Sequence, residues 1–167
     1  GMVAGNTRHY AATVDKLMQS IGSRDDEIVF GLCVFVNRGR TIVIADTNVI
    51  EYPTSEELAS IAKSSARVAK LLGLDPKIAF LSHSTFGQPE TDRTKRISKA
   101  VEMLKDEKVD FLFDGEMQPD VALNNKYKGT YSFSNIVGSA NVLVMPSIHA
   151  AATVSYTHLR AHETYKD

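Results

Sequence analysis

The sequence predicts an α/β protein: a three-layer sandwich with a mostly parallel central sheet, preceded by a β-hairpin. Three observations support this prediction. Short apolar runs typical of buried strands alternate along the chain with segments that have the spacing of amphipathic helices. Most of these runs end in polar residues, and two runs near the amino end are joined by a tight turn. Strands that alternate with helices form parallel sheets with helices packed on their faces.

The composition indicates one domain with a hydrophobic core and disfavours several kinds of partner. Of the 167 residues 43% are hydrophobic, and 19 basic against 20 acidic side chains give a formal net charge of −1. Without a block of charge, nothing favours nucleic acid or an anionic membrane as partner. The single cysteine, Cys33, cannot form an internal disulfide, and no apolar run is long enough to span a bilayer. We therefore expect a soluble, cytoplasmic protein.

The first elements follow from apolar spacing and from turn residues. Residues 9–21 have helical spacing, and Gly22 follows as a stop signal. Residues 27–36 and 40–46 are rich in β-branched side chains. Gly39 lies between them and can take the positive φ that a hairpin turn needs.

The second half of the pattern alternates helix and strand. Thr54 is a predicted N-cap with Glu57 as its capping-box partner, and the helix runs to Gly73. This helix is followed by a buried strand at 77–81, an amphipathic helix at 89–107, a strand at 109–113, a short helix at 120–123 and a strand at 141–146. We expect the basic face of the 89–107 helix to be solvated; it carries Arg93, Lys95, Arg96 and Lys99.

The strand at 77–81 gives the clearest signal of a site. It ends abruptly in Ser82-His83-Ser84-Thr85-Phe86-Gly87, and such a polar loop at the carboxyl edge of an open α/β sheet lines a ligand pocket. The hydroxyls of Ser82, Ser84 and Thr85, with the N–H groups around Gly87, suit an anionic or carbonyl oxygen. The alternative is an ordinary strand-to-helix loop whose hydroxyls only bond nearby backbone.

Two more segments are candidates for the same edge. The strand at 109–113 ends in Asp114-Gly115-Glu116, which we expect to form a polar turn. The polar turn with Thr7 and Arg8 precedes the first helix, where free N–H groups can bind an anion, although most such turns only cap the helix. The sequence contains neither a metal-ligand cluster nor a dinucleotide-binding fingerprint.

Five motifs occur together in an order typical of one family. They are Ala45-Asp46-Thr47, Pro53-Thr54-Ser55-Glu56-Glu57-Leu58, the 81–87 segment, the 114–123 segment and the 138–146 segment. In this order they resemble the phosphate acetyl/butyryltransferase family over nearly all of residues 1–152. The Arg38-Gly39-Arg40-Thr41 hairpin and the Gly5-Asn6-Thr7-Arg8-His9-Tyr10 segment further resemble the C-terminal, phosphotransacetylase-like domain of the large bacterial NADP-dependent malic enzymes. On this resemblance the chain is an internal fragment with a partial phosphotransacetylase-like fold.

The resemblance implies a ligand, acetyl-CoA or a related acyl-CoA, and a set of contacts for it. The implied contacts are Thr7, Arg8, Ser82, Ser84, Thr85, Gly87, Asp114, Gly115 and Glu116. It implies no catalytic residue and no cofactor in this fragment. NADP and the divalent metal of malate oxidation would belong to a malic-enzyme domain of the parent chain, which would be this domain's partner within a homo-oligomer.

Two departures from the family disfavour acyl transfer by this chain. An ungapped alignment places Asp15 where active phosphotransacetylases carry a phosphate-binding arginine, and a carboxylate repels phosphate. The family's closing segment, with its aspartate base and a second phosphate-binding arginine, has no counterpart here. Residues 153–167 look instead like translated cloning sequence, so we expect a domain over 1–152 and a non-native tail over 153–167.

Three functions follow from these observations. The first is a regulatory and oligomerisation domain that senses acetyl-CoA in an NADP-dependent malic enzyme, whose parent chain decarboxylates malate oxidatively to pyruvate. The second is a phosphate acetyltransferase that moves acetyl between CoA and phosphate, which Asp15 and the missing closing segment disfavour. The third is a scaffold domain with a vestigial pocket, and the residues do not separate the first function from the third.

Overall fold

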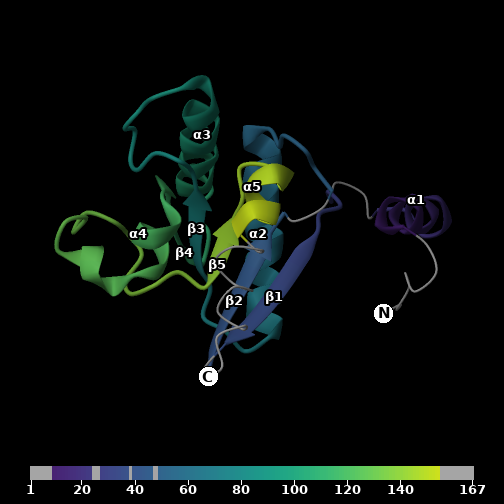
Figure 1. The fold of residues 1–167 in the computed structure, drawn as a ribbon, viewed down its shortest axis with the longest axis horizontal. Helices are drawn as coiled ribbons and strands as arrows, with labels where there is room; N and C mark the ends of the chain where they lie inside the picture. The colour runs from purple at the N-terminus through teal and green to yellow at the C-terminus, as the bar shows by residue number, and fades with distance from the viewer. Residues whose placement is uncertain (1–8, 24–26, 38, 47–48, 155–167) are drawn as a thin grey trace.

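The computed structural model describes residues 9–23, 27–37, 39–46 and 49–154, which form five strands, five α-helices and one 3₁₀ helix (Figure 1). In chain order they are α1 (Tyr10–Ser20), β1 (Leu32–Asn37), β2 (Arg40–Ala45), α2 (Ser55–Leu71), β3 (Lys77–Leu81), α3 (Asp92–Asp106), β4 (Leu112–Met117), α4 (Pro119–Leu123), η1 (Asn125–Lys128), β5 (Val142–Val144) and α5 (Ile148–Val154).

The strands form a single sheet in the order β1-β2-β5-β3-β4. β1 pairs antiparallel with β2, whereas β2, β5, β3 and β4 pair parallel with their neighbours. The first pair is the predicted hairpin: Asn37 lies opposite Arg40, and Gly39 between them has a φ of 77°. The mostly parallel sheet with an initial hairpin confirms the fold class predicted from the sequence.

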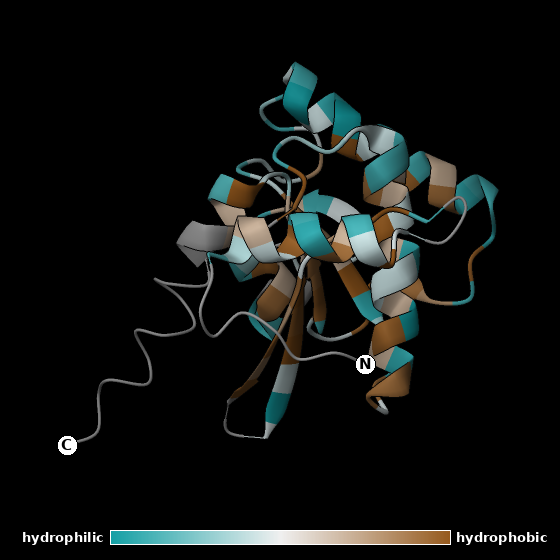
Figure 2. Cartoon of the chain, turned by 90° about the vertical axis from the view of Figure 1, so that its right-hand side faces the viewer, coloured by the Kyte–Doolittle hydropathy of each residue, from teal (hydrophilic) through white to brown (hydrophobic). Residues whose placement is uncertain are grey.

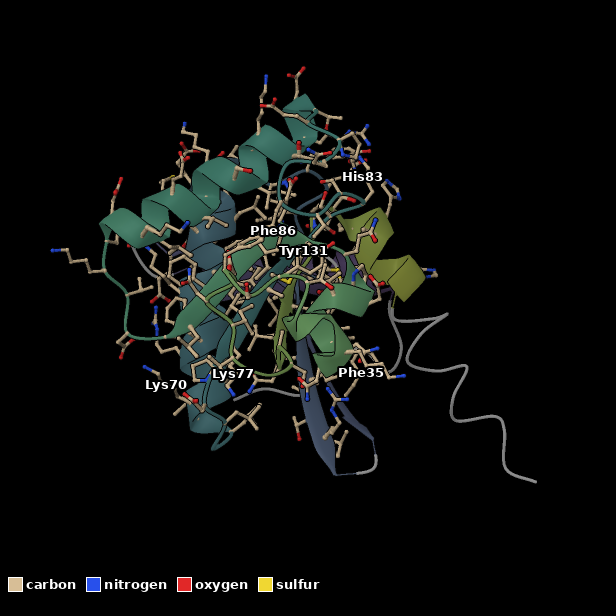
Figure 3. All side chains as sticks on the ribbon, turned by 90° about the vertical axis from the view of Figure 1, so that its left-hand side faces the viewer. Phe35, Lys70, Lys77, His83, Phe86 and Tyr131 are labelled. Carbon is tan, nitrogen blue, oxygen red and sulfur yellow. The ribbon has the colours of Figure 1, made fainter. Side chains whose placement is uncertain are left out.

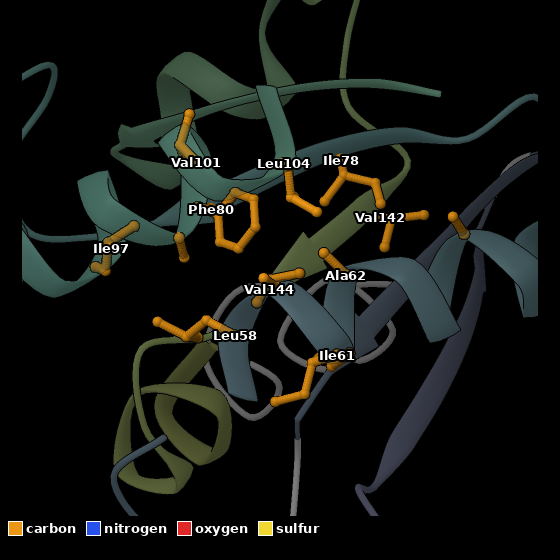
Figure 4. Close-up of a cluster of buried hydrophobic side chains, with 14 of the residues drawn as sticks. Leu58, Ile61, Ala62, Ile78, Phe80, Ile97, Val101, Leu104, Val142 and Val144 are labelled. Atoms are coloured by element: carbon orange, nitrogen blue, oxygen red, sulfur yellow. The ribbon is translucent and has the colours of Figure 1, made fainter. Parts of the chain in front are cut away.

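Two hydrophobic clusters, one on each face of the sheet, make the three layers. On one face α2 and α3 cover the sheet, and Leu58, Ile61 and Leu104 of these helices meet Ile78 and Phe80 of β3 (Figure 4). On the other face the strands pack against α4, α5 and the segment between α4 and β5, through residues such as Ala122, Ile136 and Ala151. The strands are mostly hydrophobic, and the helices show hydrophilic outer faces (Figure 2).

α2 begins where the sequence predicts. The Thr54 side chain accepts a hydrogen bond from the Glu57 backbone N–H, and the Glu57 carboxylate accepts one from the Thr54 N–H, so both halves of the capping box form.

α1, by contrast, has no buried residue and lies apart from the sheet on the side of β1 (Figure 1). Within the described part of the chain, no helix combines the length and apolar character needed to cross a membrane.

One predicted boundary was wrong in a way that matters for the site. The segment Asp114-Gly115-Glu116, expected as a polar turn, lies within β4 and pairs with β3. The two carboxylates are tolerated in a strand because each accepts hydrogen bonds from other segments, Asp114 from the Asn135 N–H and Glu116 from the Ser84 hydroxyl. Gly115 has a φ of 149°, and a Cβ added to it would lie 2.8 Å from the Phe80 Cβ. Only glycine therefore allows β3 and β4 to approach this closely.

Candidate functional site

A cavity of about 460 Å³ lies at the carboxyl ends of β3 and β5, beside the first turns of α3. β3 and the loop after it contribute Leu81, Ser82 and His83, while β5 and the loop after it contribute Met145, Pro146 and Ser147. α3 contributes Arg93, Arg96 and Ile97, α5 contributes His149, and the segment before α2 contributes Tyr52. A cleft outside the carboxyl ends of parallel strands is where open α/β sheets bind ligands.

The cavity combines an apolar floor with cationic and ionisable groups. Leu81, Ile97 and Met145 are buried and form the apolar part. Two arginines and two histidines also line the cavity, and none of its described lining residues is an aspartate or glutamate. This charge balance favours an anionic ligand with an apolar portion.

The Ser82–Gly87 loop is held in place by a carboxylate from the neighbouring strand. The Ser84 hydroxyl donates to Glu116 Oε1 over 2.6 Å, and the Gly87 N–H donates to the same oxygen over 3.0 Å. Ser84 and Glu116 are 0% and 1% exposed. Glu116 Oε2 is buried as well and has no hydrogen-bond partner among the described residues. Glu116 therefore fixes the loop from behind, below the surface of the cavity.

Ser82 connects this buried pair to the cavity. Its hydroxyl lies 3.1 Å from the Ser84 hydroxyl, and Ser82 itself is among the lining residues. Because Ser84 gives its single hydroxyl hydrogen to Glu116, the Ser82 hydroxyl donates to Ser84, and Ser82 Oγ can still accept a hydrogen bond from a ligand. Of the three hydroxyls predicted in this loop, the one on Ser82 lines the cavity.

The rest of the loop is occupied with structural contacts. Thr85 Oγ1 accepts from the Gln118 N–H over 3.2 Å, and the Gln118 side chain donates to the His83 carbonyl over 2.7 Å. Phe86 packs against Tyr131 with ring centroids 5.6 Å apart, whereas His83 lies at the far end of the loop, near α5 (Figure 3). These contacts fix the loop so that His83 and Ser82 face the cavity.

The structure brings five of the predicted site residues together. Ser82, Ser84, Thr85, Gly87 and Glu116 lie in one hydrogen-bonded region. Asp114 accepts from the Gly115 and Asn135 N–H groups further back along β4, and Gly115 lies against Phe80. Thr7 and Arg8 lie outside the described residues, so their predicted contact with a ligand stays a prediction.

The two arginines of the cavity were not predicted as site residues. The expectation of a solvated basic face on α3 is confirmed for Lys95 and Lys99, which are exposed and pair with Glu90 and Glu56. Arg93 is exposed too, as expected, although it lies at the cavity, and the expectation was wrong for Arg96, which is half-buried there. Their spacing of three residues, on the helix that follows the Ser82–Gly87 loop, places them on one face and was the signal available in the sequence.

Electrostatics on the outer face of α3 differ from those in the cavity. The Glu56 carboxylate accepts a hydrogen bond from its own backbone N–H, and Lys99 both donates to the carboxylate and attracts it, so the pKa of Glu56 is lowered. Lys99 is thus already neutralised by a carboxylate.

No group of three or more His, Cys, Asp or Glu side chains that could hold a metal ion occurs among the residues described.

The fold and this sheet-edge cavity define an α/β domain of the phosphotransacetylase type. The chain belongs to the phosphate acetyl/butyryltransferase family, because the sequence model described as "Phosphate acetyl/butaryl transferase" matches residues 1–166. This result confirms the resemblance seen in the sequence motifs.

Two kinds of relative share this sequence. The NADP-dependent malic enzyme of Rhizobium meliloti (strain 1021) is 45% identical over 152 residues, which are 91% of this chain and 20% of the relative. The phosphate acetyltransferase of Bacillus subtilis (strain 168) is 33% identical over 152 residues, 90% of this chain and 47% of the relative. The chain thus spans about a fifth of the malic enzyme and about half of the acetyltransferase.

Solved structures agree with this assignment. A phosphotransacetylase from Streptococcus pyogenes superposes with a TM-score of 0.87 at 30% identity and covers 98% of this chain and 51% of its own. The EutD phosphotransacetylase from Staphylococcus aureus gives a TM-score of 0.81 at 28% identity, over 90% of this chain and 48% of its own.

Proposed function

We propose that this chain is part of the phosphotransacetylase-like domain of an NADP-dependent malic enzyme and that it senses acetyl-CoA or a related acyl-CoA. The relationship to the Rhizobium meliloti malic enzyme, at 45% identity over a fifth of that protein, supports the parent. The parent chain would decarboxylate malate oxidatively with NADP and a divalent metal held in its malic-enzyme domain. It would act as a homo-oligomer in the cytoplasm.

The observation that carries the proposed ligand is the sheet-edge cavity. An acyl-CoA has several phosphate charges at one end and, at the other, an acyl thioester on an uncharged arm. The cavity has cationic side chains beside a floor of Leu81, Ile97 and Met145, and its volume of about 460 Å³ suits part of such a ligand. Ser82 Oγ can accept a hydrogen bond from an N–H or O–H group of the ligand, since its own hydrogen is donated to Ser84.

A phosphate acetyltransferase activity is the second candidate, because this is the name of the Bacillus subtilis relative. His83 lies beside Ser82 in the cavity and could accept a proton from a thiol. Asp15 disfavours this function: it is exposed on α1 at the position that aligns with the phosphate-binding arginine of active enzymes. A carboxylate there would repel the phosphate that the reaction needs.

The test is to titrate acetyl-CoA into the purified polypeptide by isothermal titration calorimetry, and to assay acetyl phosphate formation from acetyl-CoA and phosphate. We expect saturable binding and no acetyl phosphate above background. Acetyl phosphate formation that is lost in a His83→Ala variant would establish the acetyltransferase instead. Absence of any binding would contradict sensing and favour a vestigial scaffold.

A further inference from the structure

We infer that Arg93 and Arg96 form a phosphate-binding wall in the sheet-edge cavity. A phosphorylated ligand would then lie with its anionic end against α3 and its apolar end over the ends of β3 and β5. The inference rests on the proposed function in taking acyl-CoA as the ligand, but the case for an anion comes from the two side chains themselves.

The first argument is that both arginines lack the partners that neighbouring cations have. On the same helix, Lys95 pairs with Glu90 and Lys99 with Glu56. Neither arginine forms an ion pair with any residue in the described part of the chain. Two unneutralised guanidinium groups next to one another make this wall the most positive part of the cavity.

The second argument concerns burial. Arg96 is half-buried, its Nε is inaccessible to solvent, and this N–H has no hydrogen-bond acceptor among the described residues. A buried donor without an acceptor is destabilising, so native structures rarely keep one without a reason. When the Arg96 side chain turns toward the cavity, an oxygen of a bound phosphate would supply the missing acceptor, and the planar guanidinium suits phosphate with paired N–H donors.

The third argument is the position of Arg93 at the start of α3. It is the second residue of the helix, where the positive end of the helix dipole disfavours a cation. An anion bound at this point would interact favourably with both the dipole and the side chain. Arg93 and Arg96 are three residues apart, so their Cβ atoms lie about 5–6 Å apart and both can reach one phosphate or diphosphate.

The opposite side of the cavity is less positive, and this gives the ligand a direction. His149 lies 3.5 Å from the carboxylate of Glu51, and Tyr52 lies beside it with a ring-centroid distance of 6.2 Å. The floor between the two sides is formed by Leu81, Ile97 and Met145. The uncharged arm of the ligand, with its acyl end, would cross this floor, away from the arginines.

The experiment compares two double variants of the 167-residue polypeptide that each remove two positive charges from α3. Arg93→Gln/Arg96→Gln removes the proposed wall, and Lys95→Gln/Lys99→Gln is the matched control on the exposed face. Each is titrated with inorganic pyrophosphate and with acetyl-CoA by calorimetry at low ionic strength. An Arg96→Lys variant tests the guanidinium itself, and circular dichroism shows whether each variant is folded.

We expect the arginine double variant to bind both probes at least about tenfold more weakly than wild type, since each lost charge-assisted hydrogen bond weakens binding by about this factor. The lysine double variant should stay within about threefold, and Arg96→Lys should fall between them. Equal weakening in the two double variants would mean a general charge effect and would overturn the inference.

The outcomes also separate the inference from the proposed function. If wild type binds acetyl-CoA and the arginine variant binds it equally well, the inference is wrong and the sensing function stands. If wild type binds pyrophosphate through the arginines but does not bind acetyl-CoA, the phosphate wall stands and the sensing function is wrong. If wild type binds neither probe, both are wrong.

Discussion

At the scale of single residues, the central feature is that Glu116 of one strand fixes the loop of another. Its Oε1 accepts hydrogen bonds from the Ser84 hydroxyl and the Gly87 N–H, and all of these contacts are buried or partly buried. The position of Ser82 at the cavity depends on this contact, because Ser84 bonds both Ser82 and Glu116. Glu116 thus acts on the site through the loop.

We predict that Glu116→Ala lowers the free energy of unfolding by about 2–4 kcal/mol, because it leaves the Ser84 hydroxyl and the Gly87 N–H without their acceptor. Ser84→Ala should cost about 1 kcal/mol, since the Gly87 N–H keeps its partner. Urea denaturation measures both, with Glu102→Ala on the exposed face of α3 as the control. A loss for Glu116→Ala no larger than for the control would show that the contact does not hold the loop.

The sequence predicted that this loop carries the site but not which hydroxyl faces it. Ser82 and Ser84 have the same chemistry and lie two residues apart, so spacing does not distinguish them. The difference comes from Glu116, 32 residues after Ser84 in the chain, and from the bend of the loop at Phe86 and Gly87, which both have positive φ. Which hydroxyl faces the cavity is therefore decided by contacts between segments that are distant in sequence, and local sequence patterns carry no information about these contacts.

At the scale of elements, the close pairing of β3 and β4 depends on Gly115. A Cβ at this position would lie 2.8 Å from both the Cβ and the carbonyl oxygen of Phe80. The φ of 149° is also one that other residues rarely adopt. Any side chain here would push β4 away from β3 and displace Glu116, the next residue.

We predict that Gly115→Ala lowers the free energy of unfolding by more than about 2 kcal/mol, through the steric clash and the unfavourable φ. The matched control is Gly129→Ala, because a Cβ at Gly129 would meet no atom within 4 Å. The control should change stability by less than about 0.5 kcal/mol. Similar effects of the two substitutions, measured by denaturant unfolding, would contradict the close approach of the strands.

Elements with strong local signals were predicted well. The capping box at Thr54 and Glu57, the hairpin turn at Gly39 and the strand at Lys77–Leu81 all form where expected. The strand predicted at 109–113 lies instead at Leu112–Met117, because Asp-Gly-Glu is typical of a turn and only long-range hydrogen bonds make these carboxylates acceptable in a strand. The inward face of α3 was predicted correctly, since Ile97, Val101 and Leu104 are buried, but the position of Arg93 and Arg96 at the cavity was missed.

At the scale of the whole molecule, the parallel sheet brings polar and charged side chains from distant parts of the chain to one edge. β3 brings Ser82 and His83, β5 brings Ser147, and α3 adds its two arginines. In the malic enzyme that we propose as the parent, a ligand at this edge would affect the malate site only by binding one state of the assembly more tightly than another. A tenfold difference in affinity would supply about 1.4 kcal/mol of coupling.

The most direct test of the account is a two-dimensional ¹H–¹⁵N NMR titration of the polypeptide with acetyl-CoA. We predict saturable shifts in the amide signals of Ser82, His83, Arg96 and Ser147, with smaller changes around Gly129, which is not among the residues that line the cavity. Saturable shifts confined to other surfaces, for example around Tyr131 and Ile136, or no shifts at all, would contradict a ligand site at the sheet edge.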